Sequence, residues 1–273
     1  MRKLNDEEIK EHQLAIMDEI DRFCRKHQIP YFLDGGTLIG AIRHNGYIPW
    51  DDDVDIMMLR PDYERFIDLF NAEQSRYHVY SLRTDAGYNL HFAKVADTGT
   101  ILHEVNLKPN KMEIGINVDL FPVDPLPQDL DDRALLRQLH HLDRIQYCKA
   151  HRMRTLHTKP LRQQMLILAY KLGYFWCSKR NLGEKQERLA KQFSQVETPY
   201  CAQITCHYKT RLPRWNVTDF VPMDHVFEER QYMIHQGYDH VLREVFGDYM
   251  QLPPEEERIP QHGLLAWEVT ENE

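Results

Sequence analysis

The sequence predicts an α+β fold, in which helices flank a mixed β-sheet and a helical, basic segment is inserted or follows as a subdomain. Over the first 126 residues, short apolar runs typical of strands alternate with segments of helical periodicity. Pro125 and Pro127 then mark a boundary, and the pattern beyond them is mainly helical. A chain of 273 residues can form one large domain or two modest ones. We therefore expect a core at residues 1–126 and a mainly helical region at 127–273 packed on it.

The first helix is expected at residues 6–27, and it leads into a short strand at residues 31–33. Asn5 and Glu8 stand three residues apart, as in a capping pair. Apolar residues follow at helical spacing, namely Ile9, Ile16, Ile20 and Phe23. We expect this helix to cover one face of the sheet.

A glycine turn follows the strand. Gly35 and Gly36 separate it from a helix expected at residues 37–43, which begins with Thr37 and ends with Arg43. Paired glycines let a ligand approach the backbone, and the first turn of a helix offers unpaired N–H groups and a positive dipole to an anion. The turn therefore predicts a place for a phosphate.

A run of aspartates stands between this helix and the next strand. Asp51, Asp53 and Asp55 precede the apolar residues 56–59. If the strand begins at Asp53, then Asp53 and Asp55 point to one face, with Cα atoms about 6.5–7 Å apart. Mg²⁺ prefers a few carboxylates together with phosphate oxygens. A solvated acidic loop is the alternative, but like charges beside a buried strand repel one another unless a cation neutralises them.

Later strands are expected at residues 78–82, 90–95, 101–105 and 114–123, after a helix that begins at Pro61. Lys94 falls inside the second of these strands, where an amino group is costly unless it meets an anion or lies at an edge. Both possibilities stay open. In the last strand, Asn117 and Asp119 share one face. An aspartate there must be paired, metal-bound or at the end of the sheet.

A strongly basic segment spans residues 144–183. It contains nine lysines or arginines and no acidic residue, in a chain whose net charge is −8. Apolar residues fall on one helical face, namely Leu161, Met165, Leu168, Leu172 and Phe175. A basic amphipathic helix with aromatic residues can lie on an anionic membrane, or it can pack on the core with a basic rim. Further helices are expected at residues 131–144, 184–193 and 237–246, with a short strand at 200–206.

Composition indicates in which cellular compartment the protein works and which kinds of partner it can bind. The acidic N-terminus does not resemble a signal peptide, and no apolar stretch of 18 residues occurs. Five cysteines without a C-x-x-C pair fit reduced thiols, and a zinc site at Cys201, Cys206 and His207 is disfavoured. We therefore expect a cytoplasmic protein, either free or peripheral at the inner face of the membrane. The negative net charge argues against nucleic-acid binding.

Three strings resemble one family. LDGGTLIGAIRHNGYIPWDDDVDI closely resembles the LicD family of phosphocholine transferases and, more distantly, the fukutin-type transferases. VDLFPVD and GDYMQLPPEEERIPQHG are similar to later LicD segments, although the family often has Gly where this chain has Glu229. The resemblance implies a nucleotidyltransferase-like catalytic core at residues 1–126 and an acceptor-side region at 127–273. It also implies transfer of phosphocholine from CDP-choline to a sugar hydroxyl of a teichoic acid, lipopolysaccharide or related glycan precursor, often carried on a lipid.

The resemblance assigns roles to the candidate residues. Asp53, Asp55 and Asp119 become the catalytic and metal-binding set for Mg²⁺, with Mn²⁺ as an alternative, and Asp119 either binds metal or takes the proton of the acceptor hydroxyl. Residues expected to bind substrate are Gly35, Gly36, Thr37, Arg43, Trp50, Asp51, Lys94 and His262.

Choline is a quaternary ammonium, which aromatic faces hold best. Trp50, Tyr47, Tyr88 and Phe121 are candidates for such a cage. The same acids would also serve a donor such as CDP-ribitol or CDP-glycerol, or a true nucleotidyltransferase. A degenerate, non-catalytic binding protein is disfavoured because the three aspartates are intact.

Overall fold

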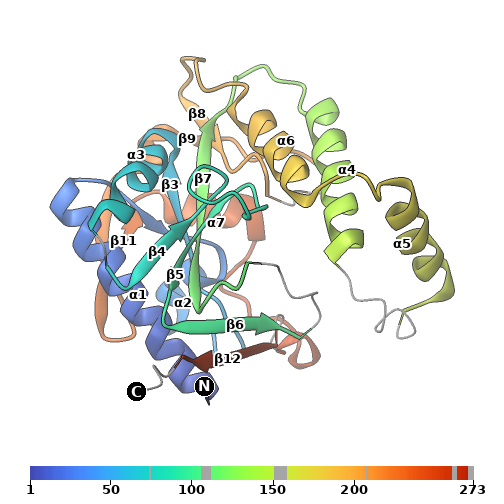
Figure 1. The fold of residues 1–273 in the computed structure, drawn as a ribbon. Coiled ribbons are helices and arrows are strands. Elements are labelled where there is room, and N and C mark those ends of the chain that lie inside the picture. The colour runs from blue at the N-terminus through green and yellow to red at the C-terminus, as the bar shows by residue number, and fades with distance from the viewer. Residues whose placement is uncertain are drawn as a thin grey trace.

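A seven-stranded mixed sheet forms the centre of the protein in the computed structural model, which describes residues 1–73, 75–105, 112–150, 159–206, 208, 210–259 and 263–269 (Figure 1). Its strands are β2 (Phe32–Leu33), β3 (Asp55–Leu59), β4 (Tyr77–Tyr80), β5 (Ala93–Asp97), β7 (Asn117–Pro125), β8 (Tyr200–Ala202) and β9 (Trp215–Asn216). The order β2-β3-β7-β5-β4 is extended by β8, which pairs with β7 and β9. β3 and β7 are parallel, and the other pairs are antiparallel. The predicted α+β fold is confirmed.

One face of the sheet packs against helices from the first third of the chain. Alternate residues of β3, Ile56 and Met58, point to this face and join the main core. α1 (Asp6–His27) and α3 (Arg60–Phe70) supply the opposing side chains. The predicted capping box of α1 is present: the Asn5 side chain accepts from the N–H of Glu8, and the Glu8 carboxylate accepts from the N–H of Asn5.

The opposite face carries the alternate residues of the same strands. Phe32, Met57 and Val123 pack there against Trp215 and against Val241 of α7 (Tyr238–Phe246). Asp55 and Asp119 fall in the same alternation as Met57 and Val123, so both belong to this face. The expected strand start at Asp53 is wrong by two residues: β3 begins at Asp55, and Asp53 lies in the preceding loop.

Strands from the C-terminal half of the chain pair with strands from the N-terminal half. β8 extends the main sheet, and β12 (Leu264–Glu268) lies between β1 (Arg2–Lys3) and β6 (Thr100–Glu104). A hairpin of β10 (Pro222–Phe227) and β11 (Arg230–His235) packs beside β2. The sequence patterns did not reveal the hairpin or β12. The division at residue 126 stays a prediction, and hydrogen-bonded strands cross it.

The hairpin turn explains why the LicD pattern often has glycine at the position of Glu229. Glu228 and Glu229 both have positive φ, of 49° and 62°, as the turn of a two-residue hairpin of this hand requires. Glycine takes this conformation with least strain. The Glu228 carboxylate accepts a hydrogen bond from the N–H of Tyr47 at 3.0 Å, so the turn also holds the loop before the aspartates.

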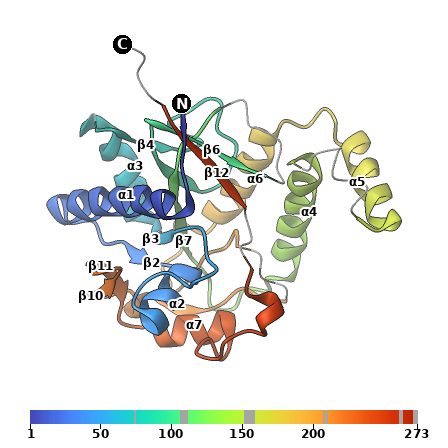
Figure 2. The same cartoon turned by 90° about the horizontal axis from the view of Figure 1, so that it is seen from below.

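Three helices stand on one side of the sheet: α4 (Arg133–Ala150), α5 (Leu161–Gly173) and α6 (Lys179–Lys191). Figures 1 and 2 both place α5 outermost, beyond α4. The expected helix at residues 131–144 is longer and starts later, and the one at 184–193 begins five residues earlier. The expected strand at 200–206 keeps only its first three residues. Short 3₁₀ helices lie at Asn71–Glu73, Val217–Asp219 and Glu255–Glu257.

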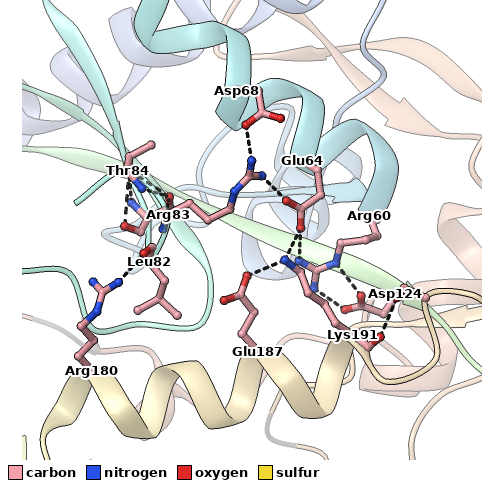
Figure 3. A network of polar contacts seen from close by, with 12 residues as sticks. Arg60, Glu64, Asp68, Leu82, Arg83, Thr84, Asp124, Arg180, Glu187 and Lys191 are labelled. Carbon is pink, nitrogen blue, oxygen red and sulfur yellow. Dashed lines mark hydrogen bonds and ion pairs between the residues drawn. The ribbon is translucent and has the colours of Figure 1, made fainter. Parts of the chain in front are cut away.

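A polar network attaches α6 to the sheet and to α3 (Figure 3). Arg180 donates to the carbonyl oxygens of Leu82 at 2.7 Å and of Asp85 at 2.8 Å, which orders the loop after β4. Lys191 pairs with Glu64 of α3 at 2.7 Å. In the same network, the buried Arg60 guanidinium donates two hydrogen bonds to Asp124 of β7, at 2.6 and 2.7 Å. A paired, fork-shaped contact of this kind fixes α3 on the sheet.

His235 makes stability depend on pH. Both of its ring nitrogens are buried without a hydrogen-bond partner among the described residues, and the ring stacks on Phe220. Burial lowers the pKa of His235 to about 4, against the small opposing effect of Asp219. Between pH 6.5 and 4 the unfolded chain therefore binds a proton that the folded chain does not, so folding stability falls as the pH falls.

We expect this histidine to remove about 2 kcal/mol of unfolding free energy between pH 7 and pH 5. The measurement is urea unfolding at both pH values for the wild type and for His235→Leu. The variant, which has no titrating ring, should lose about 2 kcal/mol less over the same interval. An identical pH dependence in the two proteins would show that His235 is not the titrating group.

Candidate active site

Asp55 and Asp119 lie side by side at the start of the parallel strand pair. They are register partners between β3 and β7, and the N–H of Asp119 donates to the carbonyl oxygen of Val54 at 2.9 Å. Since both side chains belong to the same face, the pairing brings two carboxylates from distant parts of the sequence together. The sequence predicted this juxtaposition, and the structure contains it.

The aspartates form a concentrated negative charge. Burial raises the pKa of Asp55 well above its usual value, and the negative charges of Asp53, Asp119 and Asp34 raise it further. Asp53 also raises the pKa of Asp119. These effects show that the charges interact, but by distance Asp53 groups with Asp51 and Asp52 of its own loop and not, among the described residues, in a three-carboxylate cluster with both strand aspartates. Such a group favours the arrival of a cation.

Lys94 is the cation that the protein itself supplies. Its strand position in β5 pairs with Asp119 of β7, and its Nζ donates to the Asp119 carboxylate at 2.5 Å and to Asn117 Oδ1 at 3.0 Å. The two charged side chains are 16% and 19% exposed. Burial raises the pKa of Asp119 above its usual value, and the ion pair with Lys94 opposes part of this rise. Lys94 therefore orders the site rather than lying at the sheet edge, while its contact with phosphate stays a prediction.

The glycine turn lies directly against the acidic strands. α2 (Gly35–His44) begins at the glycines themselves, two residues earlier than expected, and Asp34 caps it by accepting from the N–H of Gly35 at 2.7 Å. Gly35 has φ +49°, and a Cβ added there would lie 3.6 Å from Asp55 Oδ2. Thr37 Oγ1 accepts from the N–H of Asp55 at 2.9 Å. The Thr37 hydroxyl thus fixes the helix start to β3, and its predicted contact with substrate remains untested.

The loop before β3 contributes three more carboxylates. Oxygens of Asp51, Asp52 and Asp53 lie within 4.8 Å of one another, which is close enough for one metal ion. A Cβ added at Gly36 would stand 2.5 Å from Asp51 Oδ2, so the Asp51 carboxylate covers the first turn of α2. Asp52 Oδ1 is buried without a hydrogen-bond partner among the residues that the structure describes. Oxygen donors of this kind, one of them unsatisfied, fit Mg²⁺.

Two residues of the site escaped the sequence analysis. Asp34 is half-buried, its pKa is raised by loss of solvent around the carboxylate, and its backbone N–H donates to the carbonyl oxygen of Asp55 at 3.0 Å. Gln203 Nε2 donates to the Asp34 carboxylate, and Cys206 Sγ donates to Gln203 Oε1 at 3.1 Å. An aspartate immediately before a helix start is a typical N-cap, and that signal identifies Asp34. No local pattern marks Gln203, which arrives from a loop after β8.

Arg43 and Trp50 both contact the C-terminal region. Arg43 Nη1 donates to the carbonyl oxygens of Tyr249 at 2.6 Å and of Gln251 at 3.4 Å, so the guanidinium holds the segment after α7. The Arg258 guanidinium lies over the Trp50 ring, 5.6 Å from its centroid. The ring therefore has a face that receives a cation. The predicted contacts of Arg43 with phosphate and of Trp50 with substrate stay predictions.

The proposed aromatic cage does not assemble from all four rings. Tyr47 is buried in the main core, where its hydroxyl donates to Gln13 and its ring packs on Phe227. This burial leaves the Tyr47 ring little surface for a ligand, and the cage stays a prediction. The ring of Phe121 packs on the ring of Phe92. The hydroxyl of the buried Tyr88 donates a hydrogen bond to the backbone carbonyl oxygen of Phe92. His262 and His207 lie outside the described residues.

Comparisons with known proteins decide the family. The family described as LicD/FKTN/FKRP, nucleotidyltransferase domain, matches residues 28–163. The lipopolysaccharide cholinephosphotransferase LicD of Haemophilus influenzae is 32% identical over 271 residues, which cover 96% of this chain and 97% of that protein. This protein belongs to the LicD family. An uncharacterized Rickettsia prowazekii protein is also 35% identical over 68 residues, covering 22% of this chain and 26% of its own.

Membership of the LicD family agrees with the arrangement of the site. The family match begins just before β2 and includes the glycine turn, the acidic loop and both strand aspartates. The chain is therefore an enzyme of a transferase family with a nucleotidyltransferase-type core. None of the described helices is both long and apolar enough to cross a membrane.

Proposed function

We propose that the protein transfers phosphocholine from CDP-choline to a sugar hydroxyl of a lipopolysaccharide, teichoic acid or related cell-surface glycan precursor. The near full-length similarity to a lipopolysaccharide cholinephosphotransferase supports this substrate class. The observation that carries the proposal is the contact between the glycine turn at Gly35 and Gly36 and the carboxylates of Asp51 and Asp55. An anion-binding helix start beside a cation-binding acidic group suits a diphosphate donor.

Mg²⁺, or Mn²⁺ in its place, is part of this proposal. Asp53, Asp55 and Asp119 would hold it, with Asp51 as a further carboxylate. When bound, the ion neutralises phosphate charge and stabilises the charge that develops during phosphoryl transfer. The half-buried like charges around Asp55 support the assignment, because withdrawing them partly from water without a cation is unfavourable.

The protein's own residues would position the reactants. The N–H groups at the start of α2 would bind the phosphates of the donor, and the choline ammonium would take the place of the Arg258 guanidinium over the Trp50 ring. The acceptor oxygen attacks the phosphorus that carries choline, the bond from that phosphorus to the bridging oxygen breaks, and CMP leaves. Asp119 would take the proton of the acceptor hydroxyl or bind the metal, and Lys94 would hold the Asp119 carboxylate in either role.

The compartment follows from the proposed substrates. The proposal takes CDP-choline from the cytoplasm and transfers phosphocholine to a lipid-linked acceptor. The enzyme would therefore work in the cytoplasm, at the inner face of the membrane. The predicted peripheral membrane contact through residues 144–183 belongs to the same proposal. We also expect no nucleic-acid partner, because the net charge of the chain is −8.

The test is a product analysis with purified protein, Mg²⁺, CDP-choline and glycan acceptor. We expect CMP and phosphocholine-modified acceptor in equal amounts, and no turnover with EDTA. CDP-ribitol and CDP-glycerol are the matched donors. Faster CMP release from either of them would reassign the donor, and pyrophosphate release from CTP with transfer of CMP would indicate a nucleotidyltransferase instead.

A further inference from the structure

The outward face of α5 is apolar. Leu161, Met165 and Leu172 are spaced four and seven residues apart, so they fall on one stripe of the helix. All three are strongly exposed, Leu172 at 74%. Ile167, on the opposite side, is 1% exposed and packs on Cys148 of α4. α5 therefore uses one face to attach to α4 and leaves a second apolar face uncovered by the described part of the chain.

The apolar stripe continues past the helix. Phe175 and Trp176 follow the end of α5 and are 74% and 67% exposed. Figures 1 and 2 show α5 as the outermost element on the side of α4 away from the main sheet. Several strongly exposed large apolar side chains on one outer element and the turn after it mark a binding surface. We call Leu161, Met165, Leu172, Phe175 and Trp176 the α5 face.

Charge identifies the partner. Residues 159–179 contain four cations and no acidic residue, although the whole chain carries −8, and the next cation, Arg180, is held in the α6 network. Arg162 is exposed on α5 one position after Leu161, and Lys159 precedes the helix. Apolar side chains that enter the acyl boundary, flanked by cations that meet lipid phosphates, form a membrane-surface anchor. A second copy of the chain fits less well, because a two-fold contact would bring these cations against each other.

We propose that the α5 face docks on an anionic lipid bilayer, with Leu172, Phe175 and Trp176 in the interface and Arg162 at the phosphate level. The proposal rests on the proposed function only for its purpose, which is access to a lipid-linked acceptor. Docking itself needs neither donor nor acceptor. The structure thus favours the membrane alternative for this helix over burial of its whole apolar side in the core.

The experiment is vesicle co-sedimentation of the full chain, with phosphatidylcholine alone and with about one-third phosphatidylglycerol added. We expect binding to the anionic vesicles that weakens in about 0.5 M salt. The combined variant Leu172→Gln/Phe175→Ser/Trp176→Ser should bind roughly tenfold more weakly or worse, since it removes three apolar side chains from the interface. Arg162→Glu should weaken binding to the anionic vesicles and lower its salt sensitivity, because it removes a cation that meets the lipid phosphates. Phe246→Ser, which removes an exposed ring from α7, is the matched control and should bind as the wild type does.

Tryptophan fluorescence adds a readout at one position. Trp176 is exposed, Trp215 is buried, and Trp50 and Trp267 are half-buried, so the part of a blue shift on anionic vesicles that Trp176→Phe abolishes reports on Trp176. Trp176→Phe should keep sedimentation and lose the shift. Absence of vesicle binding, or equal binding by the combined variant, would overturn the proposal. So would dimerisation that the combined variant abolishes, without vesicle binding, because it would assign the face to a second copy. Loss of transfer to a soluble acceptor would count against the proposed function alone.

Discussion

Asp55→Asn should reduce phosphocholine transfer by about 1,000-fold or more. Asp55 is the central carboxylate of the site, because it lies against Asp119 in the strand register and its charge interacts with that of Asp53. Asparagine keeps the size of the side chain and the backbone hydrogen bond to Thr37, but it removes the negative charge that attracts the cation. The measurement is kcat/KM for CMP release over a range of Mg²⁺ concentrations, with the loss persisting at saturating metal.

The same substitution should stabilise the metal-free protein. Burial and like charges raise the pKa of Asp55, so its ionised form is unfavourable in the folded state at neutral pH. Removing this charge should raise the unfolding free energy in EDTA by about 1 kcal/mol, whereas Mg²⁺ should stabilise the wild type more than the variant. Asp129→Asn, at an exposed carboxylate, is the control and should change neither activity nor stability. Equal destabilisation of Asp55→Asn with and without metal would show a structural role instead.

The sequence identified the centre of the site because its signals are local. A glycine pair before a helix and an aspartate at the start of a buried strand each have a recognisable spacing, and the structure brings them together at Gly35 and Asp55. The strand start was misplaced by two residues because Asp53 and Asp55 fit an alternating pattern equally well whether or not Asp53 is paired in the sheet. Pairing with β7 decides this, and it is a tertiary property.

The parts that the sequence did not reveal depend on contacts between distant segments. Gln203 reaches Asp34 across 169 positions of the chain. β12 is short, and its partners β1 and β6 lie in the first 104 residues. The hairpin of β10 and β11 was missed because its turn uses Glu228 and Glu229 where glycine or asparagine usually signals such a turn. Local propensity gave no warning in these cases, because packing and strand pairing determine the outcome.

Lys94→Met should both destabilise the protein and reduce transfer by about 100-fold or more. The Lys94 ammonium is the partner of the Asp119 carboxylate, and without it Asp119 is left in a mostly buried site beside the charges of Asp53 and Asp55. The expected loss of unfolding free energy is about 2–3 kcal/mol, below that for a fully buried pair, because the two side chains remain 16% and 19% exposed. Urea unfolding and kcat/KM measure the two effects.

A double substitution separates the structural role of Lys94 from its role in the reaction. Lys94→Met/Asp119→Asn removes both charges of the pair, so no unpaired carboxylate is left at position 119 and most of the lost stability should return. Activity should stay low, because the Asp119 carboxylate itself is required for metal binding or proton transfer in the proposed reaction. Recovery of activity together with stability would mean that Lys94 and Asp119 only support the sheet. Because neutralising the pair relieves the repulsion between Asp119 and Asp55 as well, the double variant should also show weaker stabilisation by Mg²⁺ than the wild type.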